Sequence, residues 1–261
     1  MSYQFDHAWH AERARLAALE AAFDPWSMRT IMGADPRPGW RCLDVGAGGG
    51  SIAERLCQIV GPQGEVVATD VETKFLQALT APNLRVLQHD VVTDPLEEEG
   101  YDLIHVRAVL AHLPQRDAVV QKLIEALRPG GWLVAVVADF STVRATDASP
   151  DDAAFFDRSF ASVIDAARVI GFDPFYGRRI GAVLRAEGLH DTHVEGVILE
   201  WHGGHALADL YGMTFQRLRE LVVGKGVISA DDHARLLSLM GSTDFFGLSN
   251  TLYLGRGRKP A

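Results

Sequence analysis

The chain has 261 residues, of which 48% are hydrophobic and 23% are charged. This composition is typical of a globular protein and excludes a disordered chain or a small disulfide-bonded scaffold. Acidic residues outnumber basic ones by 34 to 25, which gives a net charge of −9 and argues against a nucleic-acid partner. No apolar run approaches the ~18 residues of a membrane span, so we expect no membrane partner either.

Both ends of the chain are unremarkable in composition. The first residues do not resemble a signal peptide, and the two cysteines, Cys42 and Cys57, flank a glycine-rich turn. These features favour a reducing, cytoplasmic setting in which no disulfide forms. The basic residues Arg256, Arg258 and Lys259 are typical of a frayed, solvated tail, to which we assign no function.

The first half of the chain alternates predicted helices and strands. Leu16, Leu19 and Phe23 recur at helical spacing and predict an amphipathic helix over residues 9–23. Predicted strands follow over residues 41–45, 65–69, 84–87, 101–106 and 132–137, with helices after residue 51 and over residues 118–127. This alternation predicts right-handed crossovers and a doubly wound, parallel α/β sheet.

The second half of the chain departs from this alternation. It contains a polar turn over residues 147–152, a predicted helix over 153–170 and a turn-rich segment over 171–177. The remaining predicted elements are a helix over 180–187, a strand over 192–199, a mostly helical stretch over 204–240 and a last strand over 249–254. We interpret the helical segments as caps inserted around the last two strands.

A glycine-rich turn follows the first predicted strand, because residues 46–50 are four glycines and one alanine. Such a turn leaves few side chains between the backbone and a ligand. A dinucleotide and an adenosyl cofactor both fit a glycine turn that is followed about 20 residues later by an acidic residue, here Asp70.

Further features distinguish the two cofactors. A dinucleotide fingerprint needs a glycine where this chain has Ser51, and no tyrosine has a lysine four residues after it. An NAD-dependent dehydrogenase is therefore only the third hypothesis. Asp90 closes the third strand, where its carboxylate would accept a hydrogen bond from an adenine amino group.

Five segments occur in one order: Asp44-Val45-Gly46-Ala47-Gly48-Gly49-Gly50, Val67-Ala68-Thr69-Asp70-Val71, Gln88-His89-Asp90-Val91, Tyr101-Asp102-Leu103-Ile104-His105 and Leu127-Arg128-Pro129-Gly130-Gly131-Trp132. Together they resemble the successive motifs of class I S-adenosylmethionine-dependent methyltransferases and cover about residues 38–140. The resemblance implies a Rossmann-like, seven-stranded sheet with its last strand antiparallel. It also implies S-adenosylmethionine as cofactor and S-adenosylhomocysteine as product.

The resemblance further implies which residues hold the cofactor. It assigns the ribose hydroxyls to Asp70, the adenine face to Val71, and the adenine amino edge to Asp90 with Val91. The methionine and ribose portions are assigned to the first strand and its turn, namely Asp44, Gly46, Ala47 and Gly48. These residue types suit the ligand, since a carboxylate has two acceptor oxygens and a purine fits an apolar wall.

Some of the charged residues also fit purely structural roles. Asp70 is suited to cap a helix N-terminus, and Asp90 is suited to form a turn. Arg107 fits either a cofactor-binding role, through a hydrogen bond to the cofactor carboxylate, or an ion pair with Asp102 or Asp139. The sequence alone does not choose between these roles.

Residues 106–114 correspond to the part of the family that lies near the transferred methyl group. They lack the Asn/Asp-Pro-Pro-aromatic tetrad, and no Pro-Cys nucleophile for nucleic-acid bases is found. His112 is the candidate catalytic base, because its ordinary pKa near 6.5 suits proton abstraction. A cofactor contact or a helix cap are the alternatives for this histidine.

Aromatic residues and histidines are concentrated in the two cap segments. Aromatic residues at helical spacing are usually core, but their density here favours a cover over an apolar acceptor. The candidate substrate-binding residues are Phe156, Tyr176, Trp201, His202, His205 and Tyr211, with His202 and His205 as second-choice bases. The two histidines lack neighbouring acidic or cysteine ligands, so we expect no metal site.

We therefore expect a single domain over residues 1–261, with a helical lid over 1–35, a cofactor-binding half over 36–140, and caps with the last two strands over 141–261. The expected activity is methylation of an oxygen, nitrogen or carbon atom of a small, largely apolar metabolite, by analogy with enzymes of secondary metabolism. A non-methylating cyclase or decarboxylase that binds the same cofactor is the second hypothesis. A monomer and a homodimer are both compatible with the sequence.

Overall fold

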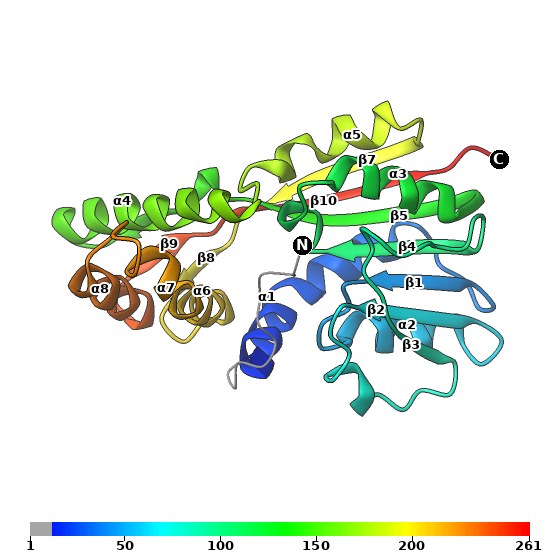
Figure 1. Cartoon of the computed structure of the whole chain (residues 1–261), viewed down its shortest axis with the longest axis horizontal. Helices are drawn as coiled ribbons and strands as arrows, with labels where there is room; N and C mark the ends of the chain where they lie inside the picture. The colour runs from blue at the N-terminus through cyan, green and yellow to red at the C-terminus, as the bar shows by residue number, and fades with distance from the viewer. Residues whose placement is uncertain (1–11) are drawn as a thin grey trace.

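The computed structural model describes residues 12–261 and contains a main sheet of seven strands in the order β3-β2-β1-β4-β5-β10-β7 (Figure 1). The strands are β1 (Arg41–Val45), β2 (Glu65–Asp70), β3 (Leu84–Gln88), β4 (Tyr101–Arg107), β5 (Leu127–Asp139), β7 (His190–Val197) and β10 (Thr251–Arg258). Strands β1 to β5 pair in parallel, whereas β10 pairs antiparallel with β5 and β7. The predicted Rossmann-like α/β sheet with an antiparallel last strand is confirmed.

Helices cover both faces of this sheet. The helices α1 (Glu12–Met32) and α2 (Ser51–Val60) pack on one face, and α3 (Arg116–Ala126) and α5 (Ile180–Ala186) pack on the other. Successive strand residues point to opposite faces, so Cys42 joins the core beneath α2 and Leu43 joins the core beneath α3. Because both faces are buried, the central strands carry apolar residues on both faces.

The cap segments form a second lobe, on the left in Figure 1, with its own aromatic core. It contains the antiparallel strands β6 (Arg144–Asp147), β8 (Glu200–His202) and β9 (Phe246–Leu248), and the helices α4 (Pro150–Ala166), α6 (Ala206–Arg217), α7 (Arg219–Val222) and α8 (Ala230–Gly241). The helix α4 begins earlier than predicted because the Ser149 hydroxyl caps it by accepting from the Asp152 N–H. The small sheet was not predicted, since its strands are too short to show a period.

Short 3₁₀ helices connect the larger elements. They are η1 (Leu76–Ala78), η2 (Leu110–His112), η3 (Phe140–Thr142), η4 (Ala167–Ile170) and η5 (Tyr176–Arg179). The helix η2 follows β4 directly, which places it at the carboxyl edge of the parallel strands.

The first helix is longer than predicted. We expected it over residues 9–23, of which 9–11 lie outside the described residues, but it continues through Pro25 to Met32. Asp24 accepts hydrogen bonds from Arg107 and Ser51, and Ile31 is fully buried. These tertiary contacts outweigh the backbone hydrogen bond that a proline removes.

The basic C-terminal segment is ordered, so the prediction of a frayed tail was wrong. Arg258 still belongs to β10, and its Nε donates to the Gly130 carbonyl oxygen at 2.9 Å. Lys259 Nζ donates to the Leu127 carbonyl oxygen at 2.7 Å. Residues 128–131, which lie between the predicted helix over 118–127 and the predicted strand over 132–137, belong to β5 and give the tail a partner.

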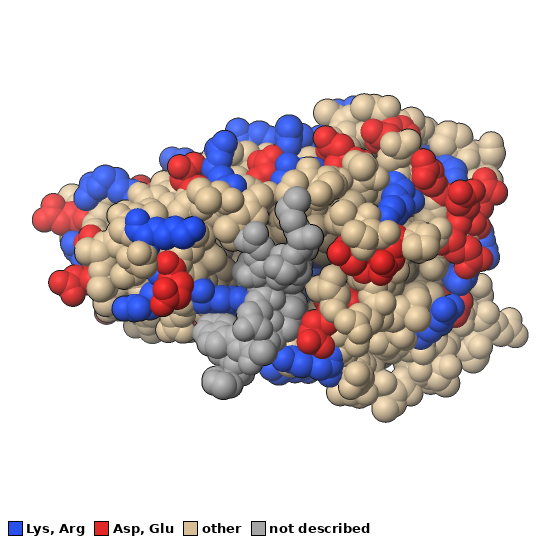
Figure 2. All heavy atoms as spheres, in the orientation of Figure 1, with Lys and Arg blue, Asp and Glu red and all other residues tan. Residues whose placement is uncertain are grey.

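Charged side chains of both signs are intermingled over both lobes on the face shown in Figure 2. Several join separate elements, as when Arg41 pairs with Glu65 at 2.6 Å and with Glu97 at 2.7 Å. Within residues 12–261, no helix combines the length and the apolar character that crossing a membrane requires.

Candidate active site

Two adjoining cavities lie at the carboxyl end of the parallel strands. The first lies beyond β2 and β3 and is closed on its other side by η2 and the segment around Phe172; it contains about 1000 Å³ of empty space, its open mouth included. The second lies between the glycine turn and α1. Gly46, Asp70, Val109 and His112 line both cavities, so the two spaces meet at these residues.

The glycine turn exposes its backbone to the second cavity. Gly46 and Gly48 have left-handed φ values of 65° and 59°, which residues with a side chain rarely adopt. A Cβ atom on Gly46 would lie 2.3 Å from Cγ2 of Val109. The Ala47 N–H donates to the Thr69 carbonyl oxygen at 2.9 Å, which ties the turn to β2.

Asp70 ends β2 and also holds the glycine turn. Its Oδ2 accepts from the Gly48 N–H at 2.9 Å, and its Oδ1 accepts from the Glu72 N–H at 3.1 Å. The next helical turn, η1, begins only at Leu76. Asp70 is therefore not a helix cap, and its buried carboxylate is fixed at the junction of the cavities.

Asp90, Val71 and Val91 line the first cavity. Asp90 Oδ1 accepts from the Val92 N–H at 2.9 Å, which is the turn-forming contact expected of an aspartate at this position. Forming the turn and facing the cavity are thus compatible, because the hydrogen bond holds the carboxylate at the cavity wall.

Asp44 lines neither cavity. It is buried in β1, and its Oδ1 lies 2.7 Å from Nδ1 of His105 in β4. The structure therefore gives no support to a direct cofactor contact by Asp44. This carboxylate instead joins two central strands beneath the glycine turn.

Arg107 lines the second cavity and is paired with α1. Its Nη1 donates to Asp24 Oδ1 at 2.6 Å, and both side chains are buried. The ion pair that we considered with Asp102 or Asp139 was wrong, because those carboxylates pair with other arginines. The Arg107–Asp24 pair anchors α1 over the end of β4.

The helix η2 brings His112 to the junction of the cavities. It starts after Ala108, whose φ of 53° is uncommon for a residue with a side chain and turns the chain away from β4. Burial is the main cause that lowers the pKa of His112 to about 4, and Arg15 and Arg116 lower it further. His112 is therefore neutral at pH 7 and is a weak general base.

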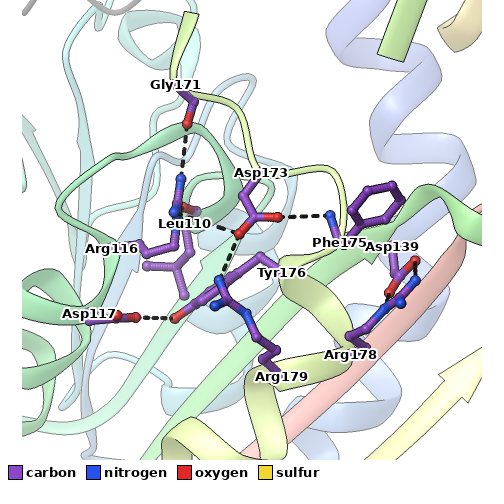
Figure 3. Close-up of polar contacts among 10 residues, drawn as sticks. All are labelled: Leu110, Arg116, Asp117, Asp139, Gly171, Asp173, Phe175, Tyr176, Arg178 and Arg179. Atoms are coloured by element: carbon purple, nitrogen blue, oxygen red, sulfur yellow. Dashed lines mark hydrogen bonds and ion pairs between the residues drawn. The ribbon is translucent and has the colours of Figure 1, made fainter. Parts of the chain in front are cut away.

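A polar network fixes the segment that carries Phe172 (Figure 3). Asp173 Oδ2 accepts from Arg179 Nη2 at 2.7 Å and lies 3.7 Å from Arg116 Nη1. Arg116 Nη2 donates to the Gly171 carbonyl oxygen at 2.9 Å. The Asp173 N–H also donates to the backbone of η2, so the network holds Phe172 against this helix.

Comparison with known proteins identifies the fold and its chemistry. A family model described as a methyltransferase domain matches residues 43–133, from β1 into β5. The methyltransferase str2 of Strobilurus tenacellus is 28% identical over 215 residues, which cover 82% of this chain and 76% of that protein. The chain is a class I S-adenosylmethionine-dependent methyltransferase.

Two further matches of this methyltransferase cover only about half of the other protein. The ubiquinone/menaquinone biosynthesis C-methyltransferase UbiE of Ectopseudomonas mendocina is 29% identical over 124 residues, which are 44% of this chain and only about half, 48%, of that protein. Phosphoethanolamine N-methyltransferase 2 of Haemonchus contortus, solved with phosphomonomethylethanolamine and S-adenosylhomocysteine, has a TM-score of 0.56 and 16% identity. That match covers 91% of this chain and 53% of the other, and it concerns the fold alone.

The predicted substrate-binding aromatics of the methyltransferase lie away from both cavities. Phe156, Trp201 and Tyr211 are buried in the core of the cap lobe, where their rings contact one another and neighbouring phenylalanines. Tyr211 also donates to Asn250 Oδ1 at 2.6 Å. Tyr176 is buried beside α3, and its hydroxyl donates to Asp117 Oδ1 at 3.3 Å.

His202 and His205 also lie outside the two cavities. His205 Nδ1 accepts from the Leu207 N–H at 3.3 Å and so caps α6, and His202 Nδ1 lies 2.8 Å from the Gly203 carbonyl oxygen. Within residues 12–261 no group of three or more potential ligands is arranged to hold a metal ion. The geometry thus gives both histidines structural contacts and offers them no contact with the cavities.

The helix α1 supplies residues that sequence reasoning missed. Arg15, Leu16, Leu19 and Glu20 line the second cavity, and their spacing places them on one face of the helix. That face carries both charged and apolar residues, and this mixture was the signal in the sequence for a cavity wall. The sequence could not show that the face covers a glycine turn instead of ordinary core.

Proposed function

We propose that the methyltransferase acts on a small, largely apolar molecule and methylates an oxygen, nitrogen or carbon atom. In this proposal the first cavity holds the adenosine part of the cofactor, and the second holds its amino-acid part. The observation that carries the proposal is the junction of the cavities, where Gly46 and His112 face the same space and Phe172 packs on the His112 ring. A recessed, partly aromatic junction suits a small acceptor.

The residues present fit S-adenosylmethionine. Asp70 offers carboxylate oxygens for ribose hydroxyls, Asp90 offers an acceptor for an adenine amino group, and Val71 with Val91 forms an apolar wall. A side chain at Gly46 would collide with Val109, which also lines both cavities. When bound, the cofactor supplies an electrophilic methyl group on a sulfonium.

In this proposal the chain contributes mainly by positioning. An in-line displacement gains most from correct orientation of the two reactants. The low pKa of His112, about 4, makes it better suited to accept a hydrogen bond from the acceptor than to remove and keep its proton. We therefore assign His112 an orienting role, with Phe172 excluding water from it.

Two further observations support a small-molecule acceptor. The UbiE relative is named for ubiquinone and menaquinone biosynthesis, in which the acceptor is a small molecule. The helix α1 crosses the second cavity, which fits the single-domain arrangement with an N-terminal lid. Ile170 and Phe172, from the first cap segment, line the first cavity.

A product assay tests this function. The purified protein is incubated with S-adenosylmethionine and a panel of phenols, amines and polyketide-like acids, and S-adenosylhomocysteine and product masses are measured. The proposal predicts S-adenosylhomocysteine together with a product that has gained one methyl group. A product of unchanged mass would favour the cyclase alternative, and the absence of S-adenosylhomocysteine with every acceptor would contradict methylation of these classes.

A further inference from the structure

The second cavity contains a carboxylate without an assigned role. Glu20 projects from α1 to the glycine turn, since a Cβ atom on Gly49 would lie only 2.1 Å from Glu20 Oε1. This oxygen is buried, and none of the residues 12–261 donates a hydrogen bond to it. A buried carboxylate oxygen without a donor is energetically costly, so a ligand that brings a donor to this point would be favoured.

The surroundings of Glu20 leave its negative charge only partly compensated. Burial is the main cause that raises its pKa, and the neighbouring Asp24 carboxylate raises it further. Arg13, Arg107 and a backbone hydrogen bond from Ser51 to the Glu20 carboxyl group oppose the rise. Arg107, however, is already paired with Asp24 at 2.6 Å, and Glu20 has no ion pair with Arg13. A cation is therefore the ligand group that best fits Glu20 Oε1.

The second cavity also carries positive charges, although the Asp70 carboxylate lines it too. Arg15 and Arg107 line it together with Glu20. Each guanidinium is paired on one side with a carboxylate of α1, Arg15 with Glu12 and Arg107 with Asp24, so the wall presents both carboxylates and guanidinium groups. An α-amino acid carries an ammonium group and a carboxylate on the same carbon, and charge-assisted hydrogen bonds to both are strong. The cavity thus has the charge pattern of a site for a zwitterionic amino acid.

We propose that Glu20 binds the ammonium group of the amino-acid part of S-adenosylmethionine, with Arg15 and Arg107 facing its carboxylate. This inference rests on the proposed function, which assigns the second cavity to that part of the cofactor. Because Glu20 belongs to α1, cofactor binding adds a direct contact between the lid helix and the glycine turn.

The test compares ligands that differ only in the amino-acid part. Wild type and Glu20→Gln are titrated in a calorimeter with S-adenosylhomocysteine, with its decarboxylated analogue, which keeps the ammonium group, and with methylthioadenosine, which lacks both groups. Glu20→Gln is expected to weaken the first two ligands by about 10- to 100-fold, as for a hydrogen bond to a charged group. The affinity of Glu20→Gln for methylthioadenosine is expected to stay within about twofold of the wild-type value.

Glu54→Gln is the matched control, because Glu54 is exposed on α2 close to the same turn; it is expected to change no affinity. Unchanged binding of S-adenosylhomocysteine to Glu20→Gln, or equal weakening of all three ligands, would overturn the proposal. Failure of wild type to bind any of the three would instead overturn the proposed function. If Glu20→Gln does not fold, Glu20→Asp replaces it, because this variant withdraws the carboxylate by one methylene group. It is expected to weaken the same two ligands by a smaller factor. An unchanged affinity for both in Glu20→Asp would overturn the proposal too.

Discussion

Phe172 lies against His112, with ring centroids 4.8 Å apart and ring planes inclined at 31°. Phe172 in turn lies edge-on to Phe140, at 5.8 Å between centroids. Phe172 covers one side of the imidazole, and burial disfavours the protonated form of the ring. The contact therefore connects the segment after the first cap helix to the protonation state of a residue at the cofactor junction.

The lowered pKa of His112 predicts a pH-dependent stability. His112 holds a proton less readily in the folded state than in the unfolded state, where its pKa is near 6.5. The free energy of unfolding is therefore highest above pH 6.5 and falls as the pH is lowered from 6.5 towards 4. The loss is at most about 1.4 kcal/mol per pH unit. Urea denaturation at pH 7.5 and pH 5 should show a larger fall for wild type than for His112→Gln. An identical fall in both proteins would show that His112 titrates normally.

Asp173 is predicted to stabilise the segment that carries Phe172. Asp173→Asn removes the charge that pairs with Arg179 and Arg116, and we expect it to lower the free energy of unfolding by about 1–2 kcal/mol. The control is Asp165→Asn, whose exposed pair with Arg168 should contribute less than about 0.5 kcal/mol. If chemical denaturation shows that Asp173→Asn and Asp165→Asn lower the free energy of unfolding equally, the network does not stabilise this segment.

Gly46 and Gly39 provide a matched pair of glycines with left-handed φ values, 65° and 86°. A Cβ atom on Gly39 meets no atom within 4 Å, whereas one on Gly46 lies 2.3 Å from Val109 Cγ2. Gly46→Ala should therefore be more destabilising than Gly39→Ala by about 1–3 kcal/mol, the usual cost of overpacking. Thermal unfolding of both variants measures the difference, and Gly46→Ala combined with Val109→Ala should recover part of it. Equal losses in the single variants would mean that the contact relaxes freely.

Asp70 is predicted to be the main polar anchor of the ribose. Asp70→Asn keeps the size of the side chain but replaces a carboxylate oxygen by a donor, and it should weaken S-adenosylhomocysteine binding by about 1.5–3 kcal/mol in calorimetry. Asp147→Asn, at an exposed position in β6, serves as the control and should bind normally. Full affinity in Asp70→Asn would move the ribose away from this carboxylate.

The cofactor half of the fold could be predicted from the sequence because its signals are local. A glycine turn such as that at Gly46 follows a short apolar strand, and acidic residues such as Asp70 end the next ones. Parallel strands bring their carboxyl ends to one edge, so the position of the cavities followed from topology. The prediction of where the glycine turn lies needed no distant contact.

The caps could not be predicted in the same way. Trp201 and Tyr211 have the same sequence signal whether they line a pocket or fill a core, and the structure places both in a core. Pairs such as Arg107 with Asp24 join residues that are far apart in the chain, so no period in a single sequence reveals them. For the same reason, the face of α1 that carries Glu20 could be recognised as a face but not as a cavity wall.

Parallel calorimetric titrations of wild type with S-adenosylhomocysteine and with NADH test the central claim most directly. The account predicts that S-adenosylhomocysteine binds at one site per chain and that NADH does not bind. S-adenosylhomocysteine at about 100 times its dissociation constant should add about 2.7 kcal/mol to the free energy of unfolding. Binding of NADH without binding of S-adenosylhomocysteine would contradict the account and make the glycine turn a dinucleotide site.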